Sequence, residues 1–61
     1  MSVVHTTDYG NGYSLDQLEN ERGELYYRAC KGSMCRYAED HYIAVMYLEG
    51  MGWDPTQQAL Q

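Results

Sequence analysis

Residues 14–32, SLDQLENERGELYYRACKG, decide which fold class the sequence predicts. The segment begins like a helix, because Ser14 is a good N-cap and Gln17, three residues later, completes a capping-box pattern. It ends like one too, since Gly32 is the residue type favoured in the left-handed conformation just after a helix. Between these ends, apolar residues recur at helical spacing. They are Leu15, Leu18, Leu25, Tyr26 and Ala29. We therefore expect a first helix over residues 14–32.

A second helix is predicted directly afterwards, over residues 33–50. Ser33 would cap it and Gly50 would end it. Apolar residues and one histidine spaced three or four apart form its expected core stripe. They are Met34, Tyr37, Ala38, His41, Val45 and Leu48. The connection is so short that the two predicted helices must form a hairpin or cross at a steep angle.

The two ends of the chain complete the predicted architecture. Residues 1–13 contain SVVHTT, which has strand character but no partner strand in a helical protein. We expect an extended arm, or a strand that pairs only if a second copy or a partner offers an edge. Asp54 followed by Pro55 is a strong helix-start signal and predicts a short third helix over residues 54–61, with Trp53 covering the hairpin. The sequence thus predicts an all-α fold: a single small helical domain, made of a hairpin, a short third helix and an N-terminal arm.

Composition limits the classes of partner. The 61 residues include nine acids and four bases, for a net charge of −5, which argues against direct binding to a phosphate backbone. The same charge suits an encounter with a basic site on another protein. Seven tyrosines, one tryptophan and no phenylalanine give aromatic area with polar tips, which is favoured at interfaces. No segment resembles a signal peptide or a membrane span, so we expect an intracellular, cytoplasmic protein.

The cysteines allow three interpretations. Cys30 and Cys35 flank the expected turn in CKGSMC. In a reducing compartment, two buried free thiols are favoured. A disulfide across the turn is one alternative, and a zinc site that recruits His5 and His41 is another, although the spacing suits zinc poorly. We therefore expect no metal and no cofactor.

The sequence also lacks a convincing catalytic or DNA-reading constellation. His41 falls on the predicted core stripe, and a general base needs a second group aimed at a pocket. Glu39 and Asp40 are adjacent, so on a helix they point about 100° apart and form no carboxylate dyad. A helix-turn-helix would present Arg36 against these two acids, which is a poor reader of DNA. We expect no enzymatic activity.

The remaining surface predicts a protein partner. Ile43 and Tyr47 fall opposite the predicted core stripe, beside Arg36 and Asp40, and Met46 covers one flank. Exposed apolar and aromatic residues rimmed by charge are typical of binding patches. The first predicted helix would add an acidic row beside a tyrosine. The complete set of predicted partner-binding residues is Ile43, Tyr47, Met46, Tyr27, Asp16, Glu24, Asp40 and Arg36.

These features predict a small acidic binding protein that inhibits a larger, nucleic-acid-handling partner by occluding a basic site. In size, acidity and tyrosine content the chain is similar in type to phage-encoded inhibitors of host defence such as anti-CRISPR proteins, although it shares no motif with a particular family. The alternative is a self-associating structural or regulatory protein that uses the second predicted helix as a homodimer seam.

Overall fold

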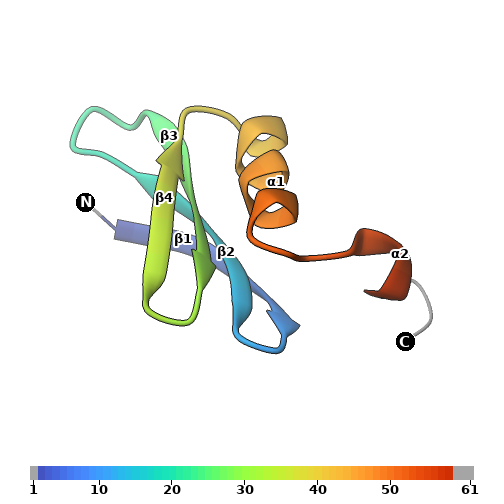
Figure 1. Cartoon of the computed structure of the whole chain (residues 1–61). Helices are drawn as coiled ribbons and strands as arrows, with labels where there is room; N and C mark the ends of the chain where they lie inside the picture. The colour runs from blue at the N-terminus through green and yellow to red at the C-terminus, as the bar shows by residue number, and fades with distance from the viewer. Residues whose placement is uncertain (1, 59–61) are drawn as a thin grey trace.

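A curved antiparallel sheet with a helix on one face forms the body of the protein (Figure 1). The computed structural model describes residues 2–58, and side chains up to residue 56. Its strands follow one another in space as they do in the sequence, in the order β1-β2-β3-β4. The elements are β1 Ser2–Gly10, β2 Tyr13–Glu19, β3 Leu25–Lys31, β4 Met34–Ala38, α1 His41–Gly50 and α2 Pro55–Gln58. The prediction of an all-α fold is therefore wrong.

The predicted helix over residues 14–32 is instead the hairpin of β2 and β3. Its turn is built around Asn20, whose side-chain oxygen accepts hydrogen bonds from the backbone N–H groups of Arg22 and Glu24 at 2.8 and 3.0 Å. Gly23 has a φ of +82°, which the turn requires and which a helix interior does not. Asn20 and Gly23 therefore form a local turn in the middle of the segment that we expected to be helical.

Leu15 and Leu18 show why the helical spacing was misleading. Leu15 pairs with Ala29 and Leu18 pairs with Tyr26 across the β2–β3 ladder. Because side chains alternate along a strand, two residues three apart lie on opposite faces of the sheet. Both leucines are nevertheless buried. A strand that buries side chains on both faces can produce the same spacing as one helical stripe.

The predicted helix over residues 33–50 is correct only in its second half. Residues 34–38 form β4, which pairs with β3 after a tight turn at Gly32 and Ser33. Gly32 does adopt the left-handed conformation, with φ +60°, but in this hairpin turn rather than after a helix. The helix α1 begins at His41, where the Asp40 carboxylate accepts a hydrogen bond from the backbone N–H of Ile43 at 3.2 Å.

The predicted arm is also ordered, because β2 supplies the partner strand that a helical fold would have lacked. β1 pairs with β2 from Ser2 opposite Glu19 to Gly10 opposite Tyr13. After α1, the chain continues into α2, where Thr56 donates its backbone N–H to the Asp54 carboxylate at 2.9 Å. The rest of the predicted third helix, residues 59–61, lies outside the described residues.

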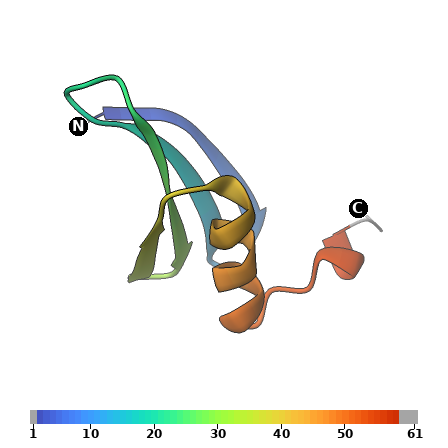
Figure 2. The same ribbon diagram turned by 90° about the horizontal axis from the view of Figure 1, so that it is seen from above.

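The core lies between α1 and the sheet. Small residues on the sheet allow α1 to approach closely, and α1 contributes Ala44 and Leu48. The buried core residues are Leu15, Ala29, Ala38, Ala44 and Leu48. Figure 2 shows α1 on one side of the curved sheet, with no described element on the other side. The outward side of α1 and the uncovered face of the sheet are therefore the surfaces available to partners.

Candidate interaction surface

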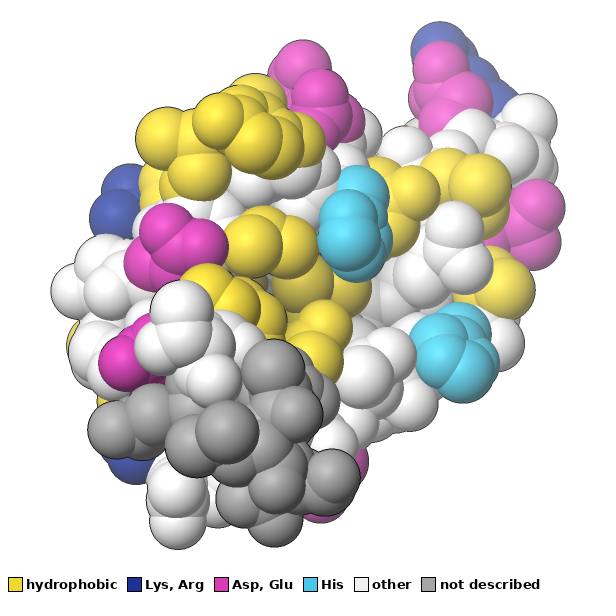
Figure 3. Space-filling model, turned by 90° about the vertical axis from the view of Figure 1, so that its right-hand side faces the viewer, with side chains coloured by type: hydrophobic (Ala, Val, Ile, Leu, Met, Phe, Trp, Pro, Cys, Tyr) yellow, Lys and Arg dark blue, Asp and Glu magenta, His cyan; other side chains and the backbone are white. Residues whose placement is uncertain are grey.

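The outward side of α1 carries apolar side chains in contact with solvent. Ala44 and Leu48 point inward, so the residues about half a turn away from them point out. Tyr42 is 72% exposed, Met46 52% and Ile43 38%. Figure 3, which views the molecule from the side of α1 and α2, shows hydrophobic side chains at the surface beside acidic ones. Exposure of large apolar residues side by side on one helix is characteristic of a binding surface.

Arg36 connects this surface to the edge of the sheet. It lies on β4, and its guanidinium stands over the ring of Tyr47 on α1, 4.2 Å from the ring centroid. Such a cation–π contact contributes ~0.5–1 kcal/mol at exposed sites. The contact links α1 to β4, and it pairs the positive charge of Arg36 with an aromatic ring of the same chain. We define the α1 patch as Arg36, Tyr42, Ile43, Met46 and Tyr47.

Acidic side chains flank the α1 patch. Glu39 and Asp40 precede α1, Glu49 lies in its last turn, and all three are exposed. Lys31, by contrast, lies over the ring of Tyr13 at 4.1 Å and donates to the backbone carbonyl of Asn11. The exposed acids therefore give both ends of α1 a negative charge.

Five of the eight residues predicted to bind a partner lie on or beside this surface. Ile43 and Met46 are exposed on α1, and Tyr47 is half-buried against Arg36. Asp40 caps the helix beside them. The sequence predicted this proximity from helical spacing, whereas Arg36 in fact reaches the patch from a neighbouring strand.

The other three predicted residues lie elsewhere, because the helix face assigned to them does not exist. Tyr27 is half-buried on the covered side of the sheet, with its ring edge-on to His41 at 5.6 Å. Asp16 is buried on the opposite face. Glu24 lies in the β2–β3 turn and accepts a hydrogen bond from the Asn20 side chain at 2.9 Å.

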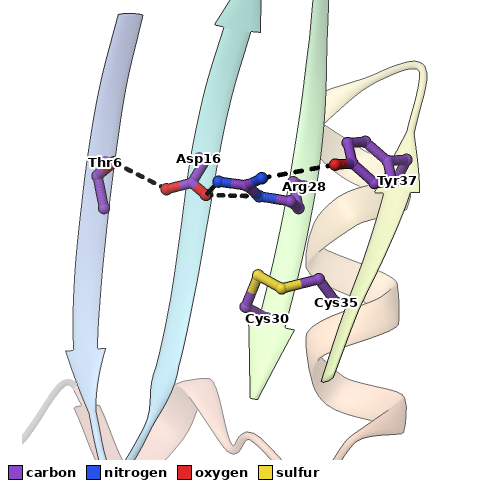
Figure 4. The surroundings of a disulfide bond; sticks show 6 residues. All are labelled: Thr6, Asp16, Arg28, Cys30, Cys35 and Tyr37. Atoms are coloured by element: carbon purple, nitrogen blue, oxygen red, sulfur yellow. Dashed lines mark hydrogen bonds and ion pairs between the residues drawn. A yellow bond between two sulfur atoms is a disulfide. The ribbon is translucent and has the colours of Figure 1, made fainter. Parts of the chain in front are cut away.

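The uncovered face holds a polar row that the sequence analysis missed (Figure 4). Thr6 donates to Asp16 at 2.7 Å, and Arg28 donates to the other Asp16 oxygen through Nε and Nη2 at 2.8 and 2.6 Å. Arg28 Nη1 also lies 3.5 Å from the Tyr37 hydroxyl. Hydrogen bonds to Tyr37 and to Asp16 raise the pKa of the Arg28 guanidinium above its ordinary value. The row joins all four strands, since it takes one residue from each. Only a sheet register could have revealed it.

The two cysteines form a disulfide beside this row, so the expectation of free thiols is wrong. Cys30 and Cys35 face each other directly in the β3–β4 ladder, just before and just after the hairpin turn. Disulfides persist mainly in oxidising compartments. The bond therefore weakens the inference of a cytoplasmic location.

Other chemistry is sparse in the described part of the chain. Within residues 2–58, no group of three or more histidine, cysteine or acidic side chains could hold a metal ion. His41 contacts the Tyr27 ring, and Gln17 donates to the Tyr27 hydroxyl at 3.4 Å. Both histidines of the chain are visible in Figure 3. An open hollow at the β2–β3 turn is lined by Asn20, Glu21, Arg22, Glu24 and Tyr26.

Comparison with protein families, with curated proteins and with solved structures found no match. The description of the chain as an inhibitor or as a small phage-type protein therefore gains no support from relatives. Among residues 2–58, no helix is both long enough and apolar enough to cross a membrane.

Proposed function

We propose that this chain is a non-enzymatic binding protein that docks its α1 patch onto a basic, partly apolar surface of a larger protein. The observation that carries the proposal is the exposure of Tyr42, Ile43 and Met46 side by side on α1. Large apolar residues surrounded by charge provide the desolvated centre and polar rim of a typical interface.

The charge of the patch defines the partner. Glu39, Asp40 and Glu49 give the ends of α1 a negative field, and the chain as a whole carries −5. A basic groove of the kind that holds a nucleic-acid backbone is complementary to this field. The bound chain would occlude that groove, and long-range attraction would steer the encounter.

A second copy of the chain is a poorer occupant of the α1 patch. Two α1 helices packed against each other would bring the acids at their ends into proximity, which like-charge repulsion opposes. The alternative of a homodimer seam on this helix is therefore less well supported than a foreign, basic partner. The proposal concerns the chemistry of the partner and does not extend to a cytoplasmic location, because of the Cys30–Cys35 disulfide.

The proposal is tested by capture from a lysate of the source organism on the immobilised chain, after nuclease treatment. Wild type is compared with Met46→Glu and with Leu25→Glu, a matched change at a similarly exposed apolar residue beside the β2–β3 turn. We expect a bound protein that heparin, a polyanion, elutes, and that Met46→Glu fails to retain while Leu25→Glu retains it. Melting curves confirm that both variants are folded. The proposal is contradicted if Met46→Glu retains the bound protein as well as wild type does, or if heparin does not elute that protein.

The rim charges give a kinetic test of the same proposal. Charges at the edge of an interface chiefly change the association rate. Glu39→Lys should therefore slow association with the captured protein and leave dissociation nearly unchanged. The difference should shrink as added salt shortens the Debye length below ~8 Å. Surface plasmon resonance across a salt series measures both rates, and an association rate insensitive to salt and to Glu39→Lys would exclude a basic partner surface.

A further inference from the structure

Among the described residues 2–58, β1 is an edge strand with no strand paired to its outer side. The strand order β1-β2-β3-β4 leaves β1 and β4 at the two edges of the sheet. β1 spans nine residues, and β2 is its neighbour on one side only. An edge strand presents a row of backbone N–H and C=O groups that can pair with another chain.

The composition of β1 does not protect this edge. Lysine, proline, inward-pointing charges and β-bulges are the usual devices against edge-to-edge pairing. Ser2–Thr7 contains none of the first three, and four of its six residues are β-branched. Val4 is 52% exposed. The ladder with β2 has two register shifts, one between Val3 and His5 and one between Asp8 and Gly10, and His5–Asp8 pairs regularly with β2 between them. This regular stretch can accept a further strand.

The opposite edge differs in charge and length. β4 has five residues, with Arg36 at its centre. Antiparallel pairing of two β4 strands about that centre would oppose two arginines, which is unfavourable. The same edge also adjoins the α1 patch through the Arg36–Tyr47 contact. Self-pairing is therefore favoured at β1 and disfavoured at β4.

We propose that two copies of the chain pair antiparallel through their β1 edges and join the two sheets into one of eight strands. A two-fold axis perpendicular to the sheet makes such a contact self-complementary, and it preserves the faces of both sheets. With the axis at Thr6, Thr6 of one copy faces Thr6 of the other, and His5 faces Thr7 of the second copy. Threonine pairs of this kind are favourable across strands. The two Asp8 residues are separated along the strands by four positions, or ~13 Å.

A neutral edge also explains why the occupant is a second copy. A chain of net charge −5 repels itself over most of its surface. Ser2–Thr7 carries no formal charge with His5 neutral, so two copies can approach there with little repulsion. Because the axis keeps faces matched, both α1 helices would lie on the same side of the joined sheet. If the proposed function holds, the dimer presents two α1 patches to one partner, which increases avidity. The dimer itself does not depend on that function.

Equilibrium sedimentation over a concentration series tests the inference on the oxidised chain of 61 residues. Wild type should shift toward twice the monomer mass as concentration rises. Val4→Glu places new acids near Asp8 of the second copy and should weaken the dimer about tenfold. Met34→Glu, at the similarly exposed residue of β4 (56% against 52%), should leave it unchanged. Met46→Glu should also leave it unchanged, which separates failure of the dimer from failure of the proposed function.

Hydrogen exchange on the unmodified chain provides a second measurement that needs no variant. Protection of β1 amides should rise with protein concentration, while β4 amides should not change. Wild type that remains monomeric at every concentration overturns the inference. A dimer that survives Val4→Glu with folded variants, or that Met34→Glu weakens equally, also overturns it.

Discussion

The two faces of the sheet are stabilised by different interactions. On the face covered by α1, Leu15 and Ala29 pack against Leu48 in an apolar layer. On the uncovered face, the Asp16–Arg28 ion pair links neighbouring strands, with Asp16 buried and the Arg28 side chain partly exposed. Of the described helices, α1 covers one face of the sheet, and the other face combines the buried Leu18 with Asp16 and Arg28, whose polar groups must pair with each other. The comparison separates what packing contributes to the fold from what polar pairing contributes.

The largest expected effect is on the covered face. Leu48 is fully buried, so Leu48→Ala should lower the free energy of unfolding by ~2–5 kcal/mol through lost burial and a residual cavity. Met46→Ala, two positions earlier on the outward side of α1, should change it by no more than ~0.5 kcal/mol. Urea unfolding of both variants measures the difference. Similar destabilisation would mean that both sides of α1 are buried.

The uncovered face should show a smaller, charge-based effect. Arg28→Ala leaves the buried Asp16 carboxylate with Thr6 as its remaining side-chain partner. Breaking a fully buried pair costs ~3–5 kcal/mol, and because the Arg28 side chain is 29% exposed we expect ~2 kcal/mol. Adding Asp16→Ala should recover part of this loss, because the unpaired charge is then removed. A double variant no more stable than Arg28→Ala would show that the pair acts only through packing.

The disulfide should contribute a similar or slightly smaller amount. Cys30 and Cys35 are five positions apart, so the bond closes a short loop. Because the bond lowers the conformational entropy of the unfolded chain, it should raise the free energy of unfolding by ~2 kcal/mol. The hairpin has its own ladder, so the Cys30→Ala/Cys35→Ala variant should keep the fold and melt at a lower temperature. Thermal melts with and without reductant measure the shift in Tm. Complete unfolding on reduction would show that the β3–β4 hairpin depends on the bond.

The helical residues 41–50 could be predicted from the sequence, whereas the sheet could not. Leu48 is buried in a real helix as predicted, although Ala44 rather than the predicted His41 and Val45 is the other buried residue of that helix. Leu15 and Leu18 have an equally helical spacing, but they point to opposite faces of β2. Local pattern alone cannot separate these cases, because the strand pairings that decide between them connect residues distant in the sequence. The turn residues Asn20 and Gly23 were the available signal, and the capping pattern at Ser14 outweighed it.

The candidate surface was predictable to the extent that it lies on α1. Ile43, Met46 and Tyr47 could be grouped because helical spacing does hold there. Asp16 and Tyr27 were grouped with them by a helix that does not form, and the register instead places them on opposite faces. The buried ion pair and the disulfide both depend on cross-strand register. Neither could be assigned before the strands were known.

The smallest expected effect on stability belongs to the outward side of α1, and there the effect should appear in binding. Tyr42→Ala should change the free energy of unfolding by no more than ~0.5 kcal/mol, because the side chain is 72% exposed. Ile43→Ala should cost somewhat more, since Ile43 is partly covered. Both should weaken binding to the captured partner by ~2 kcal/mol, the scale of interface hot spots. Calorimetric titration beside urea unfolding gives both quantities for each variant, with Glu21→Ala on the distant β2–β3 turn as the control. If Tyr42→Ala and Ile43→Ala bind as tightly as Glu21→Ala does, the partner uses a different surface. If each variant loses no more free energy of binding than it loses free energy of unfolding, the outward residues of α1 contribute to the fold and not to a binding surface.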